Sequence, residues 1–411
     1  MPTVLDRFIT YVKIDTQSDY APQSFPSTEK QRDLSKVLAK ELEELGVREV
    51  HIGDDASVYG TMPANPPDCQ APSIGFSAHI DTTPEFSGAN VKPRIVKNYD
   101  GKDIVLNETE NIVMEVAQFP HLLNYVGQDL VVTDGTTLLG ADDKAGLACI
   151  MDMIQYFHDH PSVSHGELQF FFPSDEEVGC YGAKHVDKTR FNPQFAYTLD
   201  GGALGEITYE CFNAADAIVY IEGLNIHPGI SKNQMKNSML IAQEFLNMLP
   251  AAETPAHTEQ YEGYYHLIEF EGEVEKTRMK FYLRDHDGER FAERKERFRT
   301  MAAYLNRIHG EEMVQVEFRD TYRNTKEVIE PCFEIVEAIE KAMESLGVKA
   351  FYNPMRGGTD GSVLSFMGIP CPNICTGGHN FHGRYEYVPV QSLEAISEII
   401  IRMVKTFAKD C

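Results

Sequence analysis

Histidine and acidic residues occur in the sequence at spacings that suit metal chemistry. His79 and Asp81 end the segment SIGFSAHID, and the adjacent carboxylates Asp142 and Asp143 follow the segment LVVTDGTTLLG. Imidazole nitrogens and carboxylate oxygens are ligands that zinc, manganese and cobalt accept in proteins. Each pair also has a simpler interpretation, because a polar strand end or an aspartate that caps a helix gives the same pattern. The acids elsewhere in the chain decide in favour of a metal.

Two further groups of acids follow segments that are typical of strands buried on both faces. The apolar segment 166–173 precedes Glu176 and Glu177, and the segment 195–199 precedes Asp200. In an open α/β sheet, ligands bind at the carboxyl ends of the strands. Carboxylates that meet there repel one another unless a cation neutralises them. We therefore expect four strand ends to form a metal site from the following residues: His79, Asp142, Glu176, Glu177 and Asp200.

The spacing of His79 and Asp81 predicts a carboxylate that orients a metal-bound imidazole. Residues two apart on a strand point to the same face of the sheet. A carboxylate beside a metal-binding histidine holds the ring in one tautomer. A further nitrogen ligand is available near the end of the chain, where the segment GGHNFHGRYEY contains His379 and His382.

The elements that must position these residues form an α/β pattern in two parts. Helical periodicity at 3–15 and 27–49 precedes several short strands, and residues 83–129 interrupt the sheet with a long excursion. From about residue 210 the order becomes strand, helix, strand, strand, helix, strand, which is an α/β sandwich of its own. The expected elements of this sandwich are 212–221, 237–249, 265–270, 276–285, 290–308 and 314–319. We expect a catalytic domain of residues 1–209 and 320–411 with residues 210–319 inserted as a second domain.

Composition excludes several classes of function. The chain has 411 residues and a formal charge of −26, so a nucleic acid or an anionic membrane surface is not an expected partner. The first residues do not form a signal peptide, and no window approaches the length of a membrane span. The eight cysteines are scattered, which is typical of a reduced, cytoplasmic protein.

Eight segments, in order along the whole chain, resemble the di-zinc exopeptidase family, which includes aminoacylases, dipeptidases and succinyl-diaminopimelate desuccinylase. They are SAHIDTTPEFSGANVKP, TDGTTLLGADDKAG, PSDEEVG, TLDGG, NIHPG, LRDHD, MRGGTDGS and NFHGRYE. The first two are most similar to the family's tripeptide aminopeptidases. The resemblance implies a catalytic domain with a mixed, mostly parallel sheet flanked by helices. It also implies that the inserted α/β sandwich is a lid and dimerisation domain.

The resemblance assigns the metal ligands in this chain. His79, Asp142 and Asp200 would hold one zinc ion, and Asp142 would bridge to a second zinc ion held by Glu177 and His382. Cobalt or manganese could substitute for zinc.

Two further details of the centre follow from the resemblance. The family's histidine ligand precedes a glutamate by four residues, so Glu386 favours His382 over His379. The peptide bond between Asp142 and Asp143 is expected to be cis.

The resemblance also implies a reaction. The enzyme would release the N-terminal residue of a tripeptide by the attack of water activated between two metal ions. Glu176 would act as the general base and then protonate the leaving amine, and Asp81 would orient His79.

The inserted domain would contribute residues that contact the substrate, and the enzyme would be a homodimer. His227, in NIHPG, matches a histidine that stabilises the oxyanion in the active site of the other subunit, although a histidine before Pro-Gly is also a common turn residue. Arg284, in LRDHD, and Arg356, in MRGG, are candidates to bind the substrate carboxylate.

Three other functions remain open on the sequence alone. An amidohydrolase acting on N-acyl amino acids or dipeptides would use the same metal chemistry, and the distance from the metals to a carboxylate-binding arginine would separate it from a tripeptidase. A non-catalytic metal-binding scaffold would not need Glu176. A two-metal phosphoesterase fits the ligand types, but the order of the segments disfavours it.

Overall fold

The computed structural model describes residues 2–408 of the chain and divides it into two compact units. The first contains the chain up to Tyr209, Val328–Asn353 and the chain from Thr359 onward, and the second contains Glu210–Glu327 and Pro354–Gly358. The second unit extends beyond the boundary expected at residue 319. Its last strand, β14 (Val314–Tyr322), continues the pairing with its neighbour as far as Tyr322.

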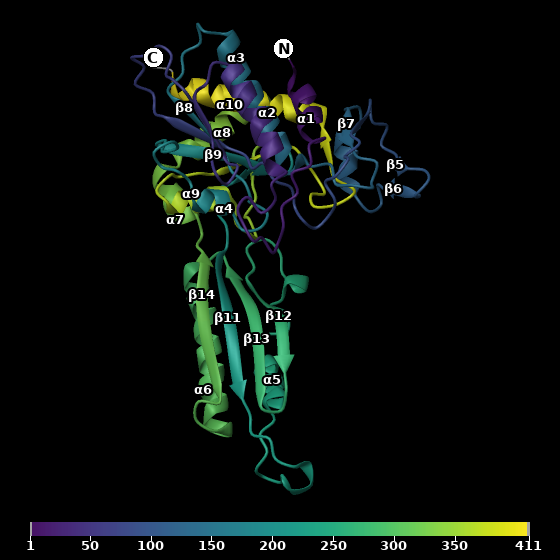
Figure 1. Cartoon of the computed structure of the whole chain (residues 1–411), viewed down its shortest axis with the longest axis vertical. Helices are drawn as coiled ribbons and strands as arrows, with labels where there is room; N and C mark the ends of the chain where they lie inside the picture. Colours follow the sequence, from purple (N-terminus) through teal and green to yellow (C-terminus); the bar gives the residue numbers. More distant parts are fainter. Residues whose placement is uncertain (1, 409–411) are drawn as a thin grey trace. The chain divides into compact units, whose positions relative to one another are not determined.

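The core of the first unit is an eight-stranded mixed sheet of order β1-β2-β8-β3-β9-β16-β10-β15, of which Figure 1 labels β8 and β9. The central strands β8, β3, β9 and β16 are parallel neighbours, as are β10 and β15, and the other neighbouring pairs are antiparallel. This confirms the mixed α/β fold. The strands are β1 (Arg48–Ile52), β2 (Val58–Met62), β3 (Ile74–Ser77), β8 (Leu168–Phe172), β9 (Phe195–Gly201), β10 (Glu206–Thr208), β15 (Phe351–Tyr352) and β16 (Asn373–Cys375).

The central strands are apolar because helices cover both faces of the sheet. Phe170 belongs to the large core cluster on one face, whereas the next residue, Phe171, belongs to a smaller cluster on the other face. Phe76 of β3 pairs in register with Phe170 of β8 and Tyr197 of β9. The carboxyl ends of these three strands therefore lie at the same edge of the sheet.

The larger cluster contains the buried faces of α1 (Val4–Tyr11), α2 (Gln31–Glu44), α3 (Ala141–Asp159), α8 (Glu334–Glu344) and α10 (Val390–Phe407). The short helices α4 (Tyr181–Lys184) and α9 (Asp360–Phe366) contribute to the smaller cluster. Glycine is required at Gly146 of α3, because a Cβ atom there would collide with the carbonyl oxygen of Leu199 in β9. The close approach of α3 to β9 brings the first residues of the helix to the carboxyl edge of the sheet.

The excursion of residues 83–129 lies outside the main sheet, as expected. It forms β4 (Arg94–Val96), the hairpin of β5 (Ile104–Asn107) and β6 (Ile112–Met114), and a 3-10 helix, η1 (Pro120–Tyr125). A separate three-stranded sheet has the order β17-β7-β4, in which β7 is Leu130–Val132 and β17 is Tyr387–Pro389. The expectation that a strand of the main sheet leads to Asp142 is therefore wrong. Local apolar pattern identified β7 as a strand but could not specify its partners.

The second unit is an antiparallel sheet of order β12-β13-β11-β14 with two helices that contact it (Figure 1). Its strands and helices follow the expected order, with β11 (Asn213–Glu222), α5 (Ser238–Asn247), β12 (Tyr264–Gly272), β13 (Lys276–Asp285) and α6 (Gly288–His309) before β14. Phe298 of α6 packs edge to face against Phe245 and Phe281, with ring centroids 5.2 and 5.1 Å apart. Short elements complete the chain: η2 (Pro228–Ile230), η3 (Pro255–His257), α7 (Lys326–Ile329) and η4 (Glu330–Cys332).

Five cysteines of the described chain that form no disulfide are Cys149, Cys180, Cys332, Cys371 and Cys375. Cys69 is disulfide-bonded, so the expectation of fully reduced cysteines is wrong at this position. The cytoplasmic location stays a prediction. Among residues 2–408, every helix is too short or too polar to cross a membrane.

Candidate metal centre

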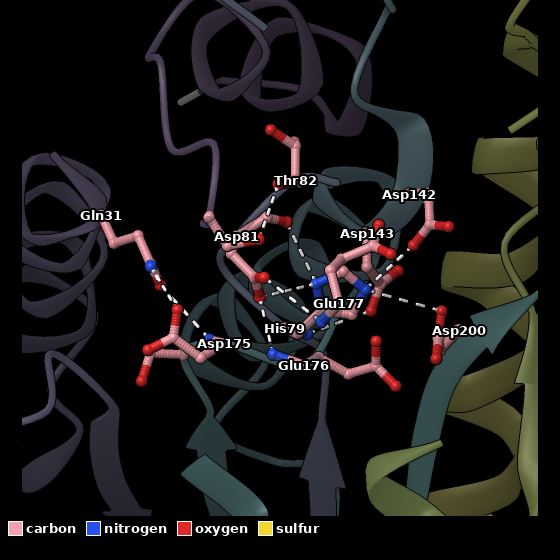
Figure 2. Close-up of polar contacts among 12 residues, drawn as sticks. Gln31, His79, Asp81, Thr82, Asp142, Asp143, Asp175, Glu176, Glu177 and Asp200 are labelled. Atoms are coloured by element: carbon pink, nitrogen blue, oxygen red, sulfur yellow. Dashed lines mark hydrogen bonds and ion pairs between the residues drawn. The ribbon is translucent and has the colours of Figure 1, made fainter. Parts of the chain in front are cut away.

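The predicted ligands meet at the carboxyl edge of the main sheet. The Nε2 atom of His79 lies 2.9 Å from Asp142 Oδ1 and 3.7 Å from Asp200 Oδ1. Figure 2 shows these carboxylates and Glu177 around the buried His79 ring. Two overlapping groups of ligand atoms lie within 4.8 Å of one another: His79 with Asp143 and Asp200, and His79 with Asp142 and Glu177.

Asp142 lies between the two predicted histidines. Its Oδ1 faces His79, and its Oδ2 lies 3.3 Å from Nε2 of His382. The same His382 nitrogen lies 3.0 Å from Glu177 Oε2. Because the two oxygens of one carboxylate face two different imidazoles, this geometry suits an aspartate that bridges two metal ions.

The protonation of the cluster reflects many carboxylates in a small volume. Burial opposes a charge on His382, but its hydrogen bonds with Asp142 and Glu177 outweigh burial and raise its pKa to about 11. Burial, reinforced by Asp142, raises the pKa of Glu177 to about 7. Burial also raises the pKa of Asp200 to about 6. The raised pKa favours a charged His382 imidazole beside these carboxylates, and a divalent cation fills the same role when the imidazole is a neutral ligand.

The donor set fits divalent metal ions. Carboxylate oxygens and imidazole nitrogens are the ligands that zinc accepts, and zinc sites of the catalytic type combine both. Oε1 of Glu177 and Oδ1 of Asp143 are buried and have no hydrogen-bond partner. Buried acceptors without a partner are rare, and an ion supplies one.

Asp81 connects His79 to the loop that carries the glutamates. Its Oδ1 lies 3.3 Å from His79 Nδ1. It accepts hydrogen bonds from the backbone N–H groups of Glu176 and Glu177, at 3.0 and 3.3 Å. The strand itself ends at Ser77, so the prediction that His79 and Asp81 share a strand face is wrong, and the loop after β3 brings them together.

The loop that carries Asp142 is held by a residue near the end of the chain. Glu386 accepts hydrogen bonds from the N–H groups of Leu139 and Gly140, both at 2.7 Å, and of Asp142 at 3.1 Å. The Asp142–Asp143 peptide bond is cis, as the family resemblance implied. The sequence indicated Glu386 only as a marker for His382, because a partner 244 residues away in the chain leaves no local pattern.

Glu85 is a second residue of the site that no pattern in the sequence singled out. Its Oε2 lies 3.2 Å from Nδ1 of His382. A carboxylate on the far nitrogen of a metal-binding histidine orients the ring and increases its basicity. Glu85 is the only acid in TTPEFSG, which is part of the first segment that resembles the family. This was the one feature of the sequence that could have indicated Glu85 as a site residue.

Glu176 lies beside the cluster and outside both groups of ligand atoms that contain His79. Its carboxylate contacts the thiol of Cys180, with 3.4 Å between Oε1 and Sγ. Burial, with the charge of Asp200 next in size, raises the pKa of Glu176 well above its usual range. A carboxylate of increased basicity next to a metal site suits proton transfer.

His379 takes no part in this arrangement. Its Nε2 lies 2.6 Å from the hydroxyl of Tyr125, and its ring stacks on His121 and Tyr387. The structure places His382, and not His379, beside Asp142 and Glu177.

The three remaining predicted site residues belong to the second unit. His227 is exposed, and its Nδ1 accepts a hydrogen bond from the N–H group of Gly229. Arg284 is buried and donates to the carbonyl oxygens of Ala215 and Leu283. Arg356 donates to the backbone oxygens of residues 258, 260 and 262. Within this unit both guanidinium groups thus have protein acceptors.

Comparison with known proteins identifies the family. The profile of Peptidase family M20/M25/M40 matches residues 133–406. The chain belongs to this peptidase family. A profile of Peptidase family M28 also matches residues 57–207.

A relative matches the chain over its whole length in sequence, and solved structures share its fold. Peptidase T of Desulfitobacterium hafniense strain Y51 is 50% identical over 410 residues, which cover 100% of this chain and 99% of that protein. The crystal structure of aminopeptidase PepT from Bacillus cereus superposes with a TM-score of 0.77 at 24% identity, over 98% of each chain. A Bacillus subtilis protein described as a dinuclear metal-binding peptidase of the M20 family has a TM-score of 0.66 at 13% identity, over 99% of this chain and 98% of that one.

Proposed function

We propose that the protein is a metallo-aminopeptidase that releases the N-terminal residue of tripeptides. The similarity to peptidase T at 50% identity over the full length supports this substrate class, as do the segments that resemble tripeptide aminopeptidases. The acidic and imidazole ligands around His79 support a metal-dependent reaction.

The observation that carries the proposal is the placement of two consecutive glutamates by one aspartate. Asp81 accepts the N–H groups of both Glu176 and Glu177. Glu177 then contacts His382 within the metal cluster, whereas the carboxylate of Glu176 lies outside the groups that contain His79. One glutamate is thereby available as a ligand and its neighbour as a base.

We infer that His79, Asp142 and Asp200 hold one zinc ion and that Asp142, Glu177 and His382 hold a second, with cobalt or manganese as possible substitutes. When bound, such ions polarise the scissile carbonyl and lower the pKa of the attacking water.

The chain's own residues would perform the proton transfers. Glu176 accepts a proton from the attacking water and delivers it to the leaving amine. Asp81 and Glu85 orient the two imidazoles, and Glu386 holds the backbone at Asp142.

We further propose a homodimer in which the second unit serves as lid and dimerisation domain. His227 would stabilise the oxyanion in the partner's active site, and Arg284 or Arg356 would bind the substrate carboxylate. The exposed apolar side chains Leu224 and Ile230, which flank His227 in sequence and are 47% and 71% exposed, support a contact surface in this segment. Sedimentation tests the assembly, since a mass of one 46.3 kDa chain under assay conditions would exclude both the dimer and the role of His227.

Hydrolysis of a matched substrate series tests the activity. The zinc-loaded protein should cleave Ala-Ala-Ala and leave Ala-Ala, Ala-Ala-Ala-Ala and N-acetyl-Ala intact. Cleavage of the dipeptide or the acyl substrate in place of the tripeptide would be consistent with the metal mechanism but would indicate an amidohydrolase that acts on dipeptides or N-acyl amino acids. If none of the four substrates is cleaved, the result would favour a non-catalytic metal-binding scaffold.

A further inference from the structure

A third group of potential ligand atoms lies beside the predicted dinuclear centre and shares no residue with it. It consists of Glu176, Cys180 and Asp360, whose carboxylate oxygens and Sγ lie within 4.8 Å of one another. Cys180 Sγ donates a hydrogen bond to Glu176 Oε1. Cys180 is a free thiol, and the residue is partly exposed.

Asp360 is the unusual member of this group. It is only 2% exposed, and its Oδ1 is buried without a hydrogen-bond partner. It begins α9, directly after the glycine-rich segment, and its carboxylate lies within 4.8 Å of both the thiol and the carboxylate of Glu176. A buried acceptor without a hydrogen-bond partner is unusual, and binding of a metal ion would give Asp360 Oδ1 a partner.

The chemistry of the three ligands selects the kind of ion. A thiolate is a soft ligand that favours zinc, cadmium and similar ions over magnesium and calcium, and carboxylates complete many zinc sites.

We propose that Glu176, Cys180 and Asp360 form a third, inhibitory site for a thiophilic divalent ion such as zinc. The ion binds the Cys180 sulfur, the thiol proton passes to solvent, and the carboxylates of Glu176 and Asp360 complete the protein ligands. Glu176 is then a ligand and cannot accept a proton from water. A third zinc ion therefore inhibits the enzyme, whereas the first two ions activate it. This consequence rests on the proposed function of Glu176 as the general base.

Cadmium is the first probe, because a cadmium–thiolate bond absorbs in the ultraviolet. Protein that already holds two zinc ions per chain is titrated with cadmium, and we expect one further equivalent to produce the thiolate band. Cys180→Ser should abolish the band and weaken binding of the third ion by at least about 100-fold. Losing a residue that only supports a metal ligand costs up to about 100-fold in affinity, and losing a direct ligand should cost at least as much. Cys332→Ser is the matched control, since Cys332 is also a partly exposed free thiol and donates to the carbonyl oxygen of Val328.

A second measurement uses the wild-type protein alone and is independent of how the variants fold. One equivalent of cadmium should protect Cys180, and not Cys332, from alkylation by iodoacetamide, as read by peptide mass spectrometry. Alkylation of Cys180 at an unchanged rate, or a third ion that binds without a thiolate band, would overturn the proposal, and so would the absence of a third ion.

Activity distinguishes this proposal from the proposed function. If tripeptides are hydrolysed, zinc beyond two equivalents should inhibit the wild type and Cys332→Ser at least tenfold, and Cys180→Ser should retain its own starting activity at the same zinc concentration. Equal inhibition of all three proteins would refute the inhibitory role. The absorbance and alkylation measurements involve no peptide, so they decide the third site even if no tripeptide is cleaved.

Discussion

Replacing Asp81 with asparagine should weaken metal binding while the protein remains folded. Asp81 is fully buried, and its carboxylate lies 3.3 Å from Nδ1 of His79 and accepts the N–H groups of Glu176 and Glu177 at 3.0 and 3.3 Å. Its backbone carbonyl oxygen also lies 3.1 Å from Nδ1 of His79. Asparagine has the same shape but only one acceptor oxygen, so its NH2 group would face at least one of these donors. A buried donor that loses its acceptor costs about 1–3 kcal/mol.

The expected effect on the metal follows from the same contacts. Loss of the partner that orients a metal-binding histidine typically lowers metal affinity about 10- to 100-fold. This corresponds to about 1.4–2.8 kcal/mol. The variant keeps the backbone carbonyl oxygen that lies 3.1 Å from His79 Nδ1, but it loses the carboxylate that positions the backbone of Glu177, a second proposed ligand, so we expect a value within this range.

The assay is competition for zinc against a chelator, combined with urea unfolding of the metal-free protein. Asp285→Asn is the matched control. Asp285 is a buried aspartate in the second unit that accepts a backbone N–H group, from Asp287, and pairs with Arg294. Both variants should lose stability, and only Asp81→Asn should lose zinc affinity. Wild-type affinity in Asp81→Asn, or an equal loss in Asp285→Asn, would refute the reasoning.

Three further predictions concern stability. Glu386→Gln can no longer accept all three backbone N–H groups, and its free energy of unfolding in urea should fall by about 1–3 kcal/mol; an unchanged midpoint would contradict this. Burial, and next the charge of His121, lowers the pKa of His379 to about 4, below the value of about 6.5 in an unfolded chain. The neutral His379 therefore contributes its full stability above pH 6.5, and up to about 3 kcal/mol of the free energy of unfolding is lost as the pH falls toward 4. Urea unfolding at pH 7 and pH 4.5 should show a smaller difference for His379→Gln than for the wild type, and equal differences would exclude His379 as the source. Arg284→Met removes the donor for two carbonyl oxygens and the cation above the ring of Tyr282, so it should lower the free energy of unfolding by about 1–3 kcal/mol, whereas unchanged stability with a raised KM would assign Arg284 to substrate binding alone.

The sequence predicted those parts of the fold that depend on strong local periodicity. The boundaries of β13 agree with the expected range 276–285, because the alternation of a long strand is complete within the element itself. The order of elements in the second unit was predicted for the same reason. The strand before Asp142 was identified as well, but its membership of a separate sheet depends on β4 and β17, which are distant in sequence.

Within the site, residue types were more informative than contacts. The acids and histidines that lie together could be chosen because few other arrangements allow so many carboxylates after buried strands. Glu85 and Glu386 could not be chosen in the same way, since each acts through a partner more than 200 residues away. Cys180 was only one of eight scattered cysteines until the fold placed its thiol beside Glu176.

The most direct test of the account compares the wild type with Glu176→Gln at equal metal content. Metal analysis should find two zinc ions per chain in both proteins, because Glu176 lies outside the groups that contain His79. Turnover of Ala-Ala-Ala should fall by about 10²–10⁴-fold in the variant, the usual contribution of a positioned general base. A fully loaded Glu176→Gln protein that cleaves the tripeptide at the wild-type rate would contradict the assignment of Glu176 as the base.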